Sequence, residues 1–131
     1  MVVRAAVQGL PLPGTDRPVR FPDLAFIMRH RAIFLMDDNL PEPLSLENSP
    51  KPLVILSLAS LKEEVRKDGD IAYLQFGPPT FKANVLQLTL SGRLLRNDGF
   101  LSSLGLSDIH VKFQKIGEKW WAVSPPSFST A

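Results

Sequence analysis

Cysteine is absent from this chain of 131 residues, and histidine occurs only at His30 and His110. Without thiols the protein has no disulfides, no thiol catalysis and no cysteine-based zinc site. With two histidines well apart in the sequence, a transition-metal site would need an unusual set of carboxylates. We therefore expect no metal and no cofactor.

Long apolar runs and a strong net charge are also missing. The longest apolar run, Ala32–Met36, is far shorter than the ~20 residues that span a bilayer. No secretory-signal pattern opens the chain. The net charge of +2 is too small to indicate a nucleic-acid footprint. We expect a cytoplasmic protein that binds neither membrane nor nucleic acid.

What the chain does contain is typical of one globular domain. Apolar residues make up 44% and charged residues 21%, and the length is sufficient for a core without disulfides or metal. Residues 1–21 show little periodicity and are broken by three prolines, so we interpret them as a flexible N-terminal arm. Residues 22–131 are then a single α+β domain.

The clearest pattern is the alternation of apolar and polar residues in the second half of the chain. It occurs in Val85–Leu90 and Ile109–Phe113, and less cleanly in Ile71–Phe76. Such alternation predicts strands with one buried face, as in an antiparallel sheet covered on one side. A short strand, Trp120–Val123, follows a glycine-containing turn. The expected core residues on this face are Leu74, Phe76, Leu86, Leu88, Leu90, Ile109, Val111, Phe113 and Trp121.

The first half of the chain predicts two helices and a strand. Asp23–Met36 is apolar nearly all round, which favours a buried helix, although Ala32–Met36 alone also fits a buried strand. Pro52–Leu56 predicts a short strand. Ser57–Lys67 has an apolar stripe at helical spacing, with Ser57 or Ser60 as its N-cap.

The closing segment Lys119–Val123, which follows a turn and an alternating strand, resembles the "turn–Lys–Trp–x–Val" hairpin of the nuclear-transport-factor-like superfamily. The order of elements over roughly residues 22–124 is similar too. The resemblance implies a cone-like α+β roll, in which a curved antiparallel sheet of four to six strands packs on one or two helices. It also implies sheet-to-sheet pairing into dimers. None of the superfamily's catalytic residues has a match in this sequence.

Three residues are candidate ligand contacts. Arg31 falls in the middle of the apolar side of the first predicted helix, where a buried guanidinium must be paired or face a pocket, unless it reaches out at the edge of the core. His110 shares a strand face with Asp108, so the two form either a dyad or an ordinary surface pair. Tyr73 lies on the polar face of its strand and offers an aromatic contact.

The polar face of the predicted sheet is the candidate interface. Its expected residues are Gln75, Gln87, Thr89, Lys112 and Trp120. Aromatic and mixed polar residues are typical of subunit interfaces, but a ligand-binding face or a solvated face has the same pattern. The sequence assigns no catalytic residue. We expect a non-catalytic binding or assembly module that acts through this face or a small pocket, as a homodimer or with a protein partner. The alternative is a small pocket enzyme or a small-molecule carrier.

Overall fold

The computed structural model describes residues 2–3, 14–15, 24–40, 51–123 and 127–130. Most of the predicted arm 1–21 and the proline-rich connection 41–50 lie outside these ranges. The described elements are α2 (Leu24–Met28), β1 (Ile33–Met36), β2 (Leu53–Leu56), α3 (Leu58–Asp68), β3 (Ile71–Phe76), β4 (Thr80–Lys82), β5 (Val85–Leu95), β6 (Ser103–Ile116), β7 (Lys119–Ala122) and β8 (Ser127–Thr130). The protein is therefore α+β, as predicted.

All described strands belong to one mixed sheet of eight strands in the order β2-β1-β3-β5-β6-β7, with β4 on β5 and β8 on β6. β1 pairs in parallel with both β2 and β3, and the remaining pairs are antiparallel. The expectation of a purely antiparallel sheet of four to six strands is wrong in these two respects. β2 and β3 flank β1, and the crossover through α3 lets β2 and β3 run in the same direction.

The predicted helix Asp23–Met36 is wrong in its second half. Helix α2 ends at Met28, and β1 follows as Ile33–Met36, with all four side chains buried. β1 lies between β2 and β3 and is covered on both faces, and such a strand has a continuous apolar sequence rather than an alternating one. That is why its pattern could not be distinguished from that of a buried helix.

The helix predicted at Ser57–Lys67 is confirmed as α3. Ser57 is its N-cap, and the hydroxyl oxygen accepts a hydrogen bond of 3.1 Å from the backbone N–H of Ser60. The helix ends at Gly69, where φ is +89° and the N–H donates to the carbonyl of Val65. Leu61 and Val65, which belong to the predicted apolar stripe, are fully buried.

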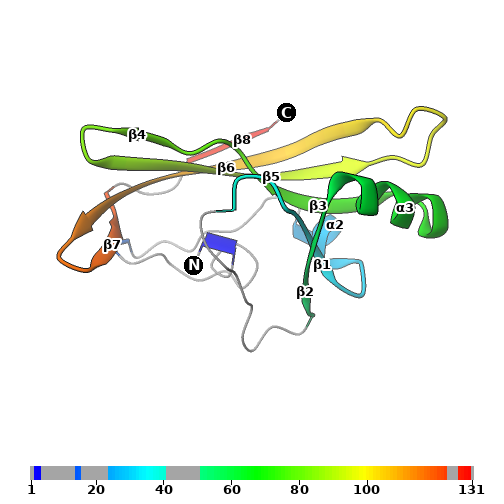
Figure 1. Cartoon of the computed structure of the whole chain (residues 1–131), viewed down its shortest axis with the longest axis horizontal. Helices are drawn as coiled ribbons and strands as arrows, with labels where there is room; N and C mark the ends of the chain where they lie inside the picture. The colour runs from blue at the N-terminus through cyan, green and yellow to red at the C-terminus, as the bar shows by residue number, and fades with distance from the viewer. Residues whose placement is uncertain (1, 4–13, 16–23, 41–50, 124–126, 131) are drawn as a thin grey trace.

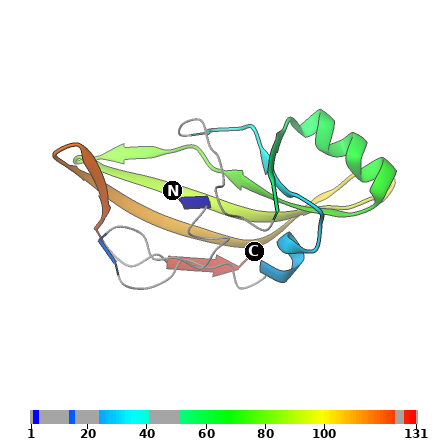
Figure 2. The ribbon, with the colours of Figure 1, turned by 90° about the horizontal axis from the view of Figure 1, so that it is seen from below.

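The larger core lies on one face of the long β5–β6 hairpin. Leu74, Phe76, Leu88, Leu90, Ile109, Val111 and Phe113 are buried there as predicted, Leu86 is partly buried, and Ile27 of α2 packs with them. Val2 and Val3 are also buried in this core, so this part of the predicted arm belongs to the domain, and Figure 2 shows the segment lying across the sheet. Trp121 is an exception, since its side chain is 36% exposed.

The opposite face is covered only in part. Helix α3 packs over its β1–β3 end, where Leu61 and Val65 meet Phe34, Ile71 and Tyr73 in a second core. Figure 1 shows α3 and α2 at this end and no described helix over the end that carries β4 and β7. In the described structure, part of one sheet face is therefore left uncovered.

Candidate functional site: the open face of the sheet

The register of β5 and β6 places the polar residues of both strands on the uncovered face. Gln87 lies opposite Lys112, Thr89 opposite His110, and Ser91 opposite Asp108. On the far side of β6, β8 adds Ser127 and Ser129 to the same face. We call this surface the open face. It is defined by residues Gln75, Thr80, Lys82, Val85, Gln87, Thr89, Ser91, Asp108, His110, Lys112, Gln114, Ile116, Trp121, Val123, Ser127 and Ser129.

His110 is at the centre of a chain of hydrogen bonds that crosses three strands. Its Nδ1 lies 3.1 Å from the hydroxyl of Thr89 on β5, and its Nε2 lies 2.9 Å from the hydroxyl of Ser129 on β8. Both ring nitrogens are therefore engaged by hydroxyl groups, and Asp108 takes neither. Of the two alternatives that the sequence leaves open for Asp108 and His110, the dyad is therefore not formed. Instead, the network fixes the imidazole ring across the sheet.

The contact between Ser129 and His110 has the distance expected for a nucleophile and its general base. The third member of the chain is the Thr89 hydroxyl rather than a carboxylate that would stabilise an imidazolium. Ser129 is exposed on an edge strand of an open surface, where water is not excluded. Chemically, this arrangement is better suited to holding the three strands in register than to catalysis.

The end of the open face at the β6–β7 hairpin is apolar. Trp121 pairs with Gln114, and the N–H of Val123 continues the ladder by donating to the carbonyl of Lys112 at 3.0 Å. Ile116, Trp121 and Val123 are 62%, 36% and 45% exposed. Three large apolar side chains thus adjoin the polar centre of the face, which is a composition typical of protein interfaces.

Two opposite charges flank the central histidine. Asp108 and Lys112 lie two residues before and after His110, so all three side chains share one face of β6. Four residues of a strand span about 13 Å. The charges are therefore symmetric about His110, one negative and one positive.

The sequence-based interface residues fall into two groups. Gln75, Gln87, Thr89 and Lys112 lie on the predicted face together with His110. Trp120 does not, because the register Phe113↔Ala122 turns it towards the larger core and brings Trp121 to the open face. The short strand Lys119–Ala122 contains two adjacent tryptophans, and its alternation therefore fits either register.

Tyr73 is also not available at the open face. Tyr73 lies on the same face of β3 as Gln75, as the alternation predicts. However, α3 covers this end of the sheet and leaves Tyr73 only 2% exposed. Its hydroxyl is hydrogen-bonded to that of Ser103 at 2.9 Å.

The sequence alone does not assign Trp121 and Ser129 to the open face. Ser129 belongs to a strand, β8, that follows two prolines and has only one large apolar residue, Phe128, as a signal.

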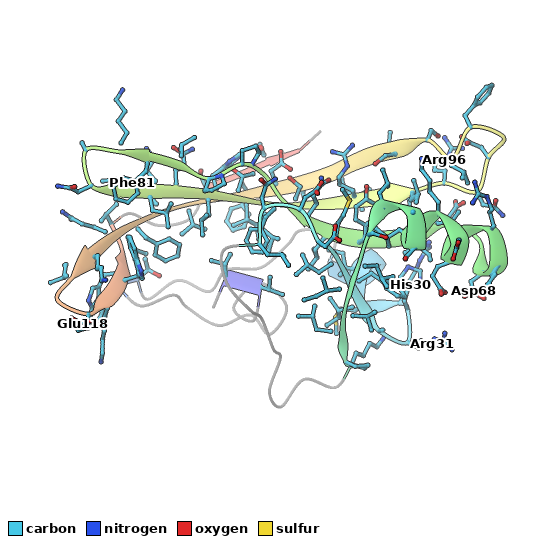
Figure 3. All side chains as sticks on the ribbon, viewed as in Figure 1. His30, Arg31, Asp68, Phe81, Arg96 and Glu118 are labelled. Carbon is cyan, nitrogen blue, oxygen red and sulfur yellow. The ribbon has the colours of Figure 1, made fainter. Side chains whose placement is uncertain are left out.

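A second candidate site is a pocket of about 280 Å³ beside the C-terminal end of α3. It is lined by His30, Arg31, Phe34, Asp68 and Ile71. The expectation that Arg31 lies on a helix is wrong, because α2 has ended at Met28. Of the two alternatives for its side chain, burial is excluded, since Arg31 lies exposed in the bend before β1. Arg31 nevertheless lines a pocket together with titratable residues. Figure 3 shows His30 and Arg31 below α3 and Asp68 at its end.

His30 is fixed in this pocket as a neutral side chain. Its Nε2 accepts a hydrogen bond of 3.0 Å from the backbone N–H of Ala72, at the start of β3, and its ring meets Phe34 edge to face. Burial lowers the pKa of His30 below its usual value, and the nearby charges of Arg29 and Lys51 lower the pKa further. Because Nε2 is an acceptor, the neutral ring carries its proton on Nδ1.

Neither a family model, nor a curated protein, nor a solved structure matches this chain. Among the described residues no helix is long and apolar enough to cross a membrane. Within the same residues no group of three or more histidines, aspartates and glutamates is placed to hold a metal ion.

Proposed function

We propose that the protein is a non-catalytic assembly module that forms a homodimer through the open face of its sheet. The observation that carries the proposal is the symmetric placement of Asp108 and Lys112 about His110. Symmetric homodimers are the commonest soluble oligomers, and their interfaces must be self-complementary. Within the open face, Asp108 and Lys112 of β6, an acid and a base at equal distances from His110, meet this condition.

The geometry of such a dimer follows from the strand. Consider a two-fold axis that lies in the interface plane, perpendicular to the strands, and passes through His110. Rotation about this axis makes β6 of one copy run antiparallel to β6 of the other. Asp108 of each copy then faces Lys112 of the other, and the two His110 side chains meet near the axis. An axis along the strands would instead place Asp108 against Asp108, which like charges disfavour. The proposed dimer is therefore the one with antiparallel β6 strands.

The size of the face indicates a weak dimer. Seven residues of β5 or β6 at ~3.3 Å and four strands at ~4.8 Å give a patch of about 23 by 19 Å. That is smaller than the ~800 Å² per partner of a standard interface, so we expect dissociation in the micromolar range. Ile116, Trp121 and Val123 supply the apolar contact at the edge of the patch. Sheet-to-sheet pairing is also what the resemblance to the nuclear-transport-factor-like superfamily implies.

Sedimentation velocity over a concentration series tests this proposal. We expect the weight-average mass to rise from the 14.5 kDa of the single chain towards twice that value as the concentration passes from about 1 to several hundred micromolar. A constant single-chain mass over this range would exclude the homodimer and leave a different protein as the occupant of the open face.

A further inference from the structure

The pocket at the end of α3 combines features that point to one class of ligand. Its lining comes from three separate parts of the chain. His30, Arg31 and Phe34 belong to the bend after α2 and to β1, Asp68 is the last residue of α3, and Ile71 begins β3. Phe34 and Ile71 are its apolar lining residues, and at 8% and 2% exposure each offers the pocket a small part of its surface. Arg31 and Asp68, both exposed, give it one positive and one negative group.

The two charges come from different elements and do not neutralise each other by a direct contact. Neither Arg31 nor Asp68 forms an ion pair with another residue in the described part of the chain. An opposite pair of rim charges above apolar walls is complementary to a molecule that carries both charges itself. Arg31 can hold a carboxylate, Asp68 can hold an ammonium group, and the walls can take an apolar side chain.

The cations beside His30 favour an anionic group on this side of the pocket. Arg29 and Lys51 lie close enough to His30 to lower its pKa, so the potential on this side of the pocket is positive and favours an anionic group there. Lys51 also donates hydrogen bonds to the carbonyls of Met28 and His30, which fixes the bend that carries Arg31. The volume of about 280 Å³ lies just below the range of typical small-molecule sites, ~300–1,000 Å³, and suits a small ligand.

We propose that this pocket binds a small zwitterion of the α-amino-acid type with an apolar side chain. The carboxylate contacts Arg31, the ammonium contacts Asp68, and the side chain rests on Phe34 and Ile71. This site is separate from the open face, because it lies at the α3 end of the sheet, and binding there does not depend on the dimer.

The test is a ¹H–¹⁵N titration of the full chain with L-leucine. We expect saturable shifts of the backbone amides in residues 30–34 and 68–72, including the Ala72 N–H that bonds to His30. Two probes each lack one charge: 4-methylpentanoate has no amine, and 3-methylbutylamine has no carboxylate. Both should bind more weakly than leucine. Glycine, which lacks the apolar side chain, should also bind more weakly.

Two substitutions at exposed positions assign the contacts. Arg31→Gln and Asp68→Asn should each weaken leucine binding about three- to tenfold, as expected for partly exposed charge contacts. Arg66→Gln and Glu63→Gln, on α3 but not in the pocket lining, are the matched controls and should leave binding unchanged. The proposal is overturned if leucine causes no saturable shift, if 4-methylpentanoate binds as well as leucine, or if the pocket variants bind like the wild type.

Discussion

Asp108 and Lys112 share one face of β6 and lie at equal distances on either side of His110. Neither residue is unusual alone, because charged side chains on exposed strands are common. Together with the imidazole that Thr89 and Ser129 fix between them, they give β6 a pair of opposite charges that is complementary to the same strand turned by 180°. This relationship is the basis of the proposed homodimer.

The first prediction concerns the core beneath the open face. Leu88 is 6% exposed and belongs to the larger core, so Leu88→Ala should lower the free energy of unfolding by ~2–5 kcal/mol. Leu86 is on the same side of β5 but only partly buried, and Leu86→Ala should cost less. Urea titration followed by far-UV circular dichroism measures both. A loss below about 1 kcal/mol for Leu88→Ala would mean that the strand register is different.

The second prediction separates the two tryptophans. Trp120 packs against the larger core, so Trp120→Glu should destabilise the fold by at least about 2 kcal/mol, because it brings a charge to an apolar contact. Trp121 lies on the open face, so Trp121→Glu should change stability by no more than about 0.5 kcal/mol but weaken self-association. Thermal denaturation and sedimentation of both variants check this. A stable Trp120→Glu protein together with an unfolded Trp121→Glu protein would reverse the assigned faces.

The third prediction follows from the neutral state of His30. Its pKa is lowered in the folded protein, mainly by burial, relative to the ordinary value of 6.5. Below pH 6.5 the unfolded chain therefore binds a proton that the folded chain resists, and stability falls as the pH decreases. Protonation of Nε2 would also break the hydrogen bond from the Ala72 N–H. Well above pH 6.5 this residue should contribute no pH dependence.

The measurement is the urea midpoint at pH 7.5, 6.5 and 5.5 for the wild type and for His30→Gln. The midpoint of the wild type should fall more steeply with acidification than that of the variant. His110→Gln serves as the control for the second histidine and should retain the steep dependence that His30 causes. Identical pH profiles for the wild type and His30→Gln would show that His30 is not held neutral.

Sequence patterns predict the sheet well where one strand face is dry and the other wet. The predicted strand Ile71–Phe76 has the observed bounds although most of both its faces is buried, whereas the strands predicted at Val85–Leu90 and Ile109–Phe113, which lie within β5 and β6, each have one buried face. Periodicity of two is unambiguous there because it persists over several residues. It fails for β1, which is buried on both faces, and for β7, where adjacent tryptophans fit either register.

The candidate sites are harder to predict, because they depend on contacts between distant segments. Alternation alone determines a strand face, and it correctly groups Gln87, Thr89, His110 and Lys112 on one surface. It cannot place Ser129 beside His110, because that contact requires the pairing of β6 with β8. The sequence offers a pocket contact for Arg31 only as one of two alternatives on a helix, whereas Arg31 lines a pocket from an exposed bend.

The charge pattern of the open face gives the most direct test of the proposed dimer. Asp108→Lys alone would place two positive charges in each cross-dimer contact, and Lys112→Asp alone would place two negative charges there. Each single variant should therefore weaken the dimer about tenfold or more. The double variant restores opposite charges in both contacts. In an equimolar mixture of the two single variants, a heterodimer of one copy of each should likewise have opposite charges in both contacts.

Sedimentation velocity of the wild type, both single variants, the double variant and the mixture at one ionic strength is the measurement. The proposed geometry predicts that the single variants are mainly monomeric at concentrations where the wild type, the double variant and the mixture are dimeric. Equal association of all five samples, or a double variant weaker than either single variant, would contradict the pairing of Asp108 with Lys112 and with it the proposed interface.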